Sequence, residues 1–266
     1  MKHWKDSVSR MKSSGMVLAA IVSGCLVFSA LPSYAQSVVS ILNLASRRAE
    51  QPVAPGSWVV ASGVFTNVDL TVATSLPLPT ALGGVTVTVE GVQAAIGSVS
   101  SSEVRFLIPS QTASGLRPVI VSGPNGAANG VVRVINAAPG IFRLGSDELP
   151  QAMVLNQDRS NNSQIRPALG GQIISIYATG PGALSQQIAD GSAAPSTPAI
   201  TTQGNVQVFV GGVECTVESS GLTPGFPSLW KVDVRIPQFA FLSGKLPVQV
   251  FMNGVDSNEV TIYVAQ

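Results

Sequence analysis

Residues 83–91 read GGVTVTVEG, and residues 204–212 read GNVQVFVGG. In each stretch a valine occupies every second position of a five-residue run, and the run then reaches a glycine-containing turn. Alternation with a period of two predicts a β-strand with one buried face. Because nearly the same stretch occurs twice, the sequence predicts two copies of one domain.

The repetition extends over most of the chain. Residues 103–109 and 231–237 both read as strands that end in Ile-Pro, and the Asn-Gly pairs at 125–126 and 253–254 both follow valine-rich runs. The spacing between equivalent pieces grows from 121 to 128 residues, which predicts an insertion of about seven residues near 221–227 in the second copy.

The fold class predicted from this pattern is all-β, with two tandem immunoglobulin-like β-sandwich domains. After residue 35 no window of about a dozen residues keeps a helical period, and 26 glycines and 18 prolines would interrupt long helices. We expect the Asn-Gly pairs to form two-residue hairpin turns with positive φ at both residues. The expected domains are 36–136 and 151–266, joined by a linker at 137–150, with a short strand at 152–155.

Residues 1–35 resemble a secretory signal peptide. Four basic residues precede a short apolar run from Met16 to Leu31, and small residues precede a cleavage point between Ala35 and Gln36. Residues 22–25 also resemble a lipobox, which would make Cys25 a lipidated N-terminus and attach the protein to a membrane. The sequence therefore predicts a secreted or cell-surface protein, with a lipoprotein as the alternative.

Removal of the leader leaves 11 basic and 13 acidic residues, because four basic residues and Asp6 are lost. A chain so close to neutral, without a basic run, is not expected to bind nucleic acid. The leader also contains His3, the single histidine, and Cys25, so that Cys215 is the one cysteine of the mature chain. We therefore expect no intramolecular disulfide and no Ser-His catalytic pair.

The chain resembles a family of paired C-terminal β-domains found in uncharacterised secreted proteins of Solibacter-type acidobacteria. The matching pieces follow one another in order: Asn43–Ser46, Ala54–Ser57, Leu78–Thr80, Gly83–Val85, Ala138–Phe142, Asn156–Asp158, Ala178–Gly180, Asp190–Gly191, Ala194–Pro195, Gly221–Phe226 and Ser257–Asn258. Arg159 and Trp230 depart from the family pattern, which has Gly and Tyr there. The resemblance implies two IPT/TIG-like immunoglobulin-like domains without enzymatic activity, and no functional residue can be carried over from it.

Acidic and basic residues give weak catalytic candidates. Lys231 and Lys245 lie near no recognisable nucleophile turn. The adjacent Asp147 and Glu148 lie in a polar stretch, whereas Glu214 and Glu218 share one strand face that is expected to be solvated. The chain is accordingly predicted not to be an enzyme, with no catalytic residue and no cofactor.

A loop at residues 156–162 places oxygen-bearing side chains at alternate positions: Asn156, Asp158, Ser160 and Asn162. Such spacing suits calcium, but no glutamate closes the loop as in an EF-hand, and Arg159 adds a positive charge. Asn and Asp also favour turns. We expect a turn and assign no metal site, with calcium as the open alternative.

Alternate residues of a strand point to opposite faces, and this parity separates the remaining candidates. Trp230, Phe106 and Cys215 share the parity of neighbouring apolar residues, which predicts that they lie in the two cores. Trp58 and Phe209 have the opposite parity. They are the possible surface-binding residues, and packing against another sheet or domain is the alternative for both.

These features predict an exported, non-enzymatic binding or structural module for cell-surface or extracellular interaction or adhesion, with an unknown protein or glycan surface as partner. The alternatives are a carbohydrate-binding accessory module and, last, an unrecognised hydrolase. Few lysines protect the strands. Open sheet edges are therefore expected to be short, bulged or covered, because long bare edges favour self-association.

Overall fold

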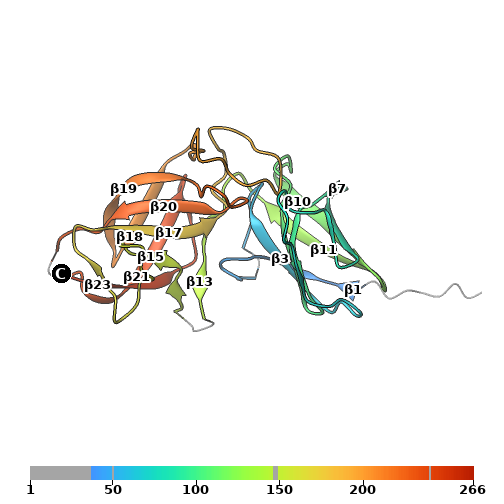
Figure 1. The fold of residues 1–266 in the computed structure, drawn as a ribbon, viewed down its shortest axis with the longest axis horizontal. Coiled ribbons are helices and arrows are strands. Elements are labelled where there is room, and N and C mark those ends of the chain that lie inside the picture. Colours follow the sequence, from blue (N-terminus) through green and yellow to red (C-terminus); the bar gives the residue numbers. More distant parts are fainter. Residues whose placement is uncertain (1–36, 50, 146–148, 240) are drawn as a thin grey trace, which may run out of the picture. The chain divides into compact units, whose positions relative to one another are not determined.

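The computed structural model describes residues 37–49, 51–145, 149–239 and 241–266. These residues contain strands and no helix, so none of their elements is a helix able to cross a membrane. They form two tandem immunoglobulin-like β-sandwiches within one compact unit, which confirms the predicted fold class. Figure 1 shows the strands of the first in blue to green and those of the second in yellow-green to red.

The first sandwich has two sheets, with strand orders β1-β11-β10-β6-β5, where β7 also pairs with β6, and β2-β3-β9-β8-β4. The strands are β1 (Ser37–Val38), β2 (Ser40–Asn43), β3 (Trp58–Ser62), β4 (Thr71–Val72), β5 (Ala81–Leu82), β6 (Val85–Val89), β7 (Val92–Gln93), β8 (Ile96–Val99), β9 (Glu103–Leu107), β10 (Gly115–Gly123) and β11 (Gly126–Val134).

The strands of the second sandwich are hydrogen-bonded in the order β12-β17-β20-β19-β18-β21-β23-β14-β13, with β15 on β17, β16 on β23 and β22 on β21. They are β12 (Gly140–Ile141), β13 (Arg143–Leu144), β14 (Gln151–Ala152), β15 (Val154–Leu155), β16 (Ala168–Leu169), β17 (Ile173–Thr179), β18 (Val206–Val210), β19 (Val213–Leu222), β20 (Trp230–Arg235), β21 (Gly244–Met252), β22 (Val255–Asp256) and β23 (Val260–Ala265).

The two copies differ most at β19. This strand pairs with β18 near its start and with β20 near its end, and a bulge lies between Val217 and Ser219. A bulge bends a strand and increases its twist, which lets β19 pass from one sheet to the other. In the first copy two separate strands make the equivalent pairings: β7 pairs with β6 and β8 pairs with β9. The turn from β19 to β20 spans residues 223–229 and that from β8 to β9 spans 100–102, so this turn holds part of the predicted insertion.

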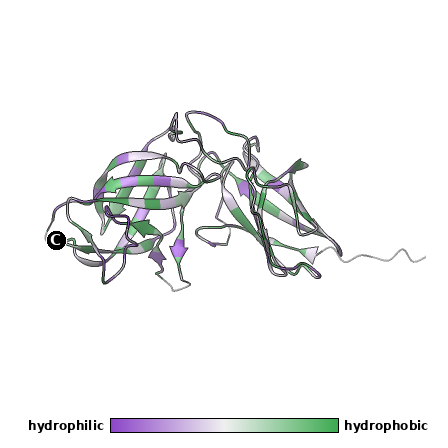
Figure 2. Ribbon diagram, viewed as in Figure 1, coloured by the Kyte–Doolittle hydropathy of each residue, from purple (hydrophilic) through white to green (hydrophobic). Residues whose placement is uncertain are grey.

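Each sandwich has its own hydrophobic core, built from alternate strand residues. Val85, Val87 and Val89 are fully buried in the first core, whereas Thr86 and Thr88 between them are partly exposed. Hydropathy accordingly varies residue by residue along the strands of both sandwiches (Figure 2). The core positions predicted for Phe106, Trp230 and Cys215 are confirmed.

Glycine-containing hairpin turns terminate the repeated strand as predicted. Gly211 and Gly212, with φ of 57° and 79°, connect β18 to β19, and Asn253 and Gly254, at 53° and 80°, connect β21 to β22. The prediction for residues 125–126 is wrong by one position. Gly123 pairs with Gly126, so Pro124 and Asn125 are the central residues. Proline lacks the N–H that a paired strand residue donates, and the turn therefore includes it.

The first strand of each copy changes sheets. β1 runs parallel to β11 and β2 antiparallel to β3, just as β14 runs parallel to β23 and β15 antiparallel to β17. The strand expected at 152–155 is thus two short strands on different sheets.

Part of the segment predicted as a linker belongs to the second sandwich. Ala137 and Ile141 are buried in its core, β12 pairs with β17, and β13 pairs with β14. Packing on the second core removes these apolar residues from water. The prediction of a linker did not take this burial into account. The other domain boundaries stay predictions.

The edge strands are short. β4, β5, β12 and β13 contain two residues each, which agrees with the expectation for a chain with few lysines. Short edges offer little backbone for pairing with another chain.

Candidate functional site

A cleft of about 430 Å³ is the candidate binding site. It is formed by residues of the first sandwich, the segment between β17 and β18, and two turns of the second sandwich. The lining residues are Pro55, Gly56, Ser110, Asn136, Gly182, Ala183, Leu184, Gln187, Ile188, Ala189, Asp190, Ser228 and Asn253.

The segment after β17 is held in place from both sides. Leu184 and Ile188 pack against a small apolar cluster of Ala194, Ile200 and Leu222. On the other side, the Asp190 carboxylate accepts the N–H of Ser110 at 3.1 and 3.2 Å, and the Leu78 N–H donates to the Gly191 carbonyl at 2.9 Å. These contacts fix the wall of the cleft without a metal or a disulfide in the described residues.

Three carboxamides give the cleft its chemistry. The Oδ1 of Asn136 accepts from Ser114, the Oε1 of Gln187 from Gln111, and the Oδ1 of Asn253 from the Asn205 N–H. The Asn205 N–H can only donate, so it fixes the orientation of the Asn253 amide, whereas the partners of Asn136 and Gln187 are groups that can both donate and accept. The described contacts include no acceptor for the three NH₂ groups. The cleft therefore presents uncharged hydrogen-bond donors.

Trp58 does not line the cleft. Its indole N–H donates to the Pro227 carbonyl at 3.0 Å, its backbone N–H donates to Thr179 Oγ1 at 2.8 Å, and its ring lies over Gly97. The ring is only half-buried, but both of its hydrogen-bonding groups join the two sandwiches. Packing, the alternative for this residue, accounts for its environment.

Phe209 lies on the second sandwich and is likewise outside the cleft. Its ring meets that of Phe251 edge-on, with centroids 5.5 Å apart and an angle of 82° between the planes. The structure does not bring Trp58 and Phe209 together, so they share no binding surface.

The loop at residues 156–162 satisfies its own oxygen atoms. Asn162 donates to Asn156 Oδ1 at 3.0 Å and accepts the Tyr263 N–H at 2.8 Å, while Asp158 accepts the Ser160 N–H at 2.9 Å. The described residues include no cluster of three or more acidic, His or Cys side chains suited to a metal. The contacts are those of a turn that ties the loop to β23.

The other candidate reactive residues are buried or paired with neighbouring side chains. Burial raises the pKa of the Cys215 thiol to about 11, which keeps it protonated and unreactive. Glu214 accepts from Gln207 and Glu218 pairs with Arg235 on the exposed face, as predicted, and Lys231 pairs with Asp233. Five predicted positions, Cys25, Ala35, Gln36, Asp147 and Glu148, lie outside the described residues.

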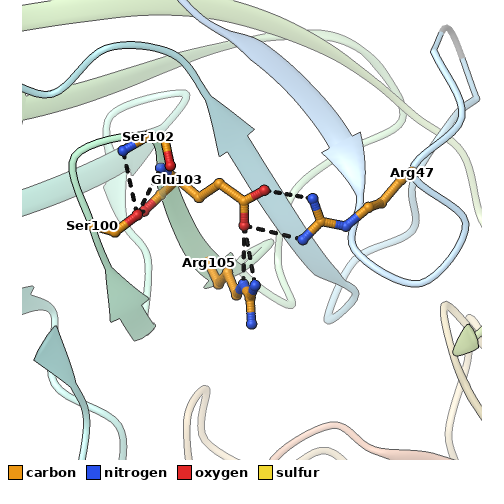
Figure 3. A network of polar contacts seen from close by, with 5 residues as sticks. All are labelled: Arg47, Ser100, Ser102, Glu103 and Arg105. Atoms are coloured by element: carbon orange, nitrogen blue, oxygen red, sulfur yellow. Dashed lines mark hydrogen bonds and ion pairs between the residues drawn. The ribbon is translucent and has the colours of Figure 1, made fainter. Parts of the chain in front are cut away.

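A charged network stabilises the first sandwich. Two guanidinium groups converge on the Glu103 carboxylate, with Arg47 binding both of its oxygens and Arg105 Nη2 lying 3.1 Å from Oε2 (Figure 3). The hydrogen bonds from Arg47, followed by those from Arg105, lower the pKa of Glu103 from 4.5 to about 2. Since Arg47 follows β2 and Glu103 begins β9, the network ties the loop after an edge strand to the sheet.

Replacing Glu103 by glutamine should lower the free energy of unfolding by about 1–2 kcal/mol at pH 7, because solvent screens part of the interaction. The pKa is lower in the folded protein, so the stabilisation is complete above pH 4.5 and declines as the pH falls towards 2. Urea unfolding of both proteins from pH 7 to pH 2 measures this difference. It should shrink with acidification, whereas a constant difference would contradict the assignment; Glu218→Gln, at an exposed pair, should change stability little.

No protein-family model and no curated protein matches the chain. Among solved structures, the chain is similar to SGBP-B of the mixed-linkage glucan utilization locus of Bacteroides ovatus, in complex with a mixed-linkage heptasaccharide, at 12% identity and a TM-score of 0.34. That similarity covers 81% of this chain and 43% of SGBP-B, so this chain spans less than half its length.

Two tandem-domain structures are similar as well. The I9–I11 tandem of titin is 10% identical with a TM-score of 0.23, covering 86% of this chain and 65% of that one. Domains 5–6 of the S-layer protein SbsC are 13% identical with a TM-score of 0.25, covering 86% and 97%. At these values the likeness concerns the fold alone, and the assignment to tandem immunoglobulin-like sandwiches follows from the strand pairing described above.

Proposed function

We propose that this chain is an exported, non-enzymatic binding module that acts in adhesion or interaction at the cell surface or outside the cell. Two features support export: the basic and apolar leader at residues 1–35, and a charged fraction of 11%. A polar, weakly charged surface over two sandwiches is typical of secreted β-proteins.

The amide-lined cleft is the observation that carries the proposal. Its volume falls within the range of small-ligand sites, about 300–1,000 Å³. The NH₂ groups of Asn136, Gln187 and Asn253 suit hydroxyl and ring oxygens, and the Asp190 carboxylate disfavours an anion. An uncharged glycan is the ligand class that fits this lining best.

The lining also supports a binding role rather than a catalytic one. It contains no histidine, lysine or cysteine, and its single carboxylate already accepts a backbone N–H from Ser110. General acid–base chemistry requires a titratable group free to exchange a proton with the substrate. Asp190 is instead used to hold the wall of the cleft.

A panel of neutral oligosaccharides, titrated calorimetrically into the chain from residue 36 onwards, tests the proposal. Gln187→Glu and Asn253→Asp keep the side-chain shape and replace the donor by an acceptor. Each should weaken binding about tenfold, the effect of one lost hydrogen bond. Gln93→Glu makes the same charge change on β7, outside the cleft, and should leave affinity unchanged. The glycan assignment would be rejected if no oligosaccharide of the panel bound. It would also be rejected if the cleft variants bound with the same affinity as the unchanged chain.

A second candidate is contact with a protein surface. The outer face of the sheet β1-β11-β10-β6 exposes Val38, Leu116 and Val131, with exposed fractions of 82%, 71% and 62%. Contiguous apolar side chains on one sheet face favour protein contacts. Capture of a protein that Leu116→Ser abolishes, without effect on glycan titration, would favour this candidate.

A further inference from the structure

The two sandwiches have equivalent ends. The Gly56 N–H donates to the Ile108 carbonyl at 2.9 Å, as the Gly171 N–H does to the Ile236 carbonyl at 2.8 Å. In both copies the Ile-Pro strand end and the residues before the long strand β3 or β17 therefore lie together. We call these the joining end of the first sandwich (Pro55, Gly56, Ser110 and Gln111) and the outer end of the second (Leu169, Gly170, Gly171, Gln238, Phe239 and Phe241).

The joining end is covered by the other sandwich. Asp190 accepts from the Ser110 N–H, and Gln111 Nε2 donates to Gln187 Oε1 at 3.3 Å. The covering residues belong to the segment that follows β17. One end of this repeat is therefore already used, within the chain, to bind a second sandwich of the same kind.

The outer end carries exposed aromatic rings instead. Phe239 and Phe241 are 46% and 70% exposed, and their rings stack with centroids 5.4 Å apart and 9° between the planes. Leu169, at the same end of the sheet, is 47% exposed. Leu242 beneath them is buried, and the C-terminal Gln266 donates to its carbonyl at 2.9 Å, which fixes the loop. Burial of these rings against a partner would be favourable.

The opposite end of the first sandwich offers a matching surface. Its loop at residues 63–70 follows β3, just as the covering segment follows β17. Phe65 and Val68 anchor the loop in the core, while Val64 and Leu70 are 78% and 77% exposed. Asn125 donates to the Thr66 carbonyl at 3.0 Å and holds the loop in place. We call Val64, Asp69 and Leu70 the leading end.

We propose that copies of this chain associate head to tail, with the leading end of one copy on the outer end of the next. The arrangement repeats between chains the contact that joins the two sandwiches within one chain. Both surfaces are apolar, and an exposed residue of opposite charge lies near each: Asp69 on the leading loop, and Lys245, the second residue of β21, near the outer end. A contact between two different surfaces leaves one of each surface free at the ends, so it extends into an open chain unless its rotation closes a ring of several copies.

Edge-to-edge pairing is a poor alternative, because the described edge strands are short. The inference is independent of the proposed function, since no residue of the leading or outer end lines the amide-lined cleft. Failure of self-association would leave glycan binding untouched, and the reverse also holds.

Sedimentation velocity and light scattering of the chain from residue 36 onwards test the proposal. The average mass should rise with concentration past that of a dimer, without a plateau for an open chain or to the mass of a closed ring of several copies. The variant Phe239→Ser/Phe241→Ser and the variant Val64→Ser/Leu70→Ser should each remain monomeric alone, and their equimolar mixture should form a 1:1 dimer and nothing larger. Val92→Ser, at an exposed position of β7 outside both ends, should associate like the unchanged chain.

The mixture is decisive because each variant retains one intact end. A symmetric contact between phenylalanine pairs would instead leave the Val64→Ser/Leu70→Ser variant self-associating, which would overturn the head-to-tail arrangement. A monomer at every concentration would overturn it too. Circular dichroism of each variant checks that these exposed substitutions leave the fold intact.

Discussion

Replacing Trp230 by alanine should lower the free energy of unfolding by about 3–5 kcal/mol, the largest loss expected from one core truncation in this chain. Trp230 is fully buried at the start of β20, between Ala178 on β17 and Leu222 on β19. Its indole N–H donates to Ser220 Oγ at 2.9 Å. The substitution removes the largest buried side chain, leaves a cavity and breaks this hydrogen bond.

Urea unfolding followed by near-ultraviolet circular dichroism measures the loss. Trp230→Phe keeps most of the ring and should lose clearly less, while Phe226→Ala, at a half-exposed ring, should change stability little. A loss for Trp230→Ala as small as that for Phe226→Ala would mean that the second core does not depend on this side chain. That result would contradict the strand parity from which its burial was predicted.

Parity made such core positions predictable. A strand with period two sends alternate residues to one face, so Trp230 had to point where Val232 and Val234 point. The same rule placed Phe106 in the first core and the Glu214 and Glu218 side chains in solvent. These predictions depend only on neighbours along one strand, which the sequence shows directly.

Contacts between the repeats were not predictable in this way. Parity placed Trp58 away from the core, but nothing in its strand indicates that Pro227, which lies far along the chain, accepts its indole N–H. The cleft has the same origin, because Asn136, Gln187 and Asn253 come from three separate connections. The one available signal was the long segment after β17, rich in Gly, Ala, Ser and Gln, which is the usual place for binding residues in a β-sandwich.

Local chemistry also displaced two predictions by small amounts. Pro124 moved a hairpin turn by one residue, and Ile141 drew part of the predicted linker into the second core. In both cases the chemistry of one residue changed a boundary that had been predicted from the pattern of several residues. Proline removes a backbone donor, and a buried isoleucine gains from leaving water.

Replacing Gly180 by alanine should destabilise the chain by about 3 kcal/mol or more, because two costs add at this position. Gly180 has a φ of 79°, in the left-handed region that L-residues avoid. A Cβ there would also overlap the Ala138 carbonyl oxygen, which is backbone and cannot rotate away. Because the Ala138 N–H donates to the Gly180 carbonyl at 3.0 Å, the two residues hold each other at the junction of the sandwiches.

Gly225→Ala is the matched control. Gly225 has a φ of 83°, and a Cβ there would meet no atom within 4 Å, so its substitution carries the conformational cost alone, about 1 kcal/mol. The difference between the two variants in urea unfolding therefore measures the clash with Ala138. Gly182, which follows two residues later, lines the cleft, so a rigid junction also keeps the NH₂ groups in register for a ligand. Equal losses for both variants would mean that the Ala138 backbone moves aside to accommodate the added Cβ.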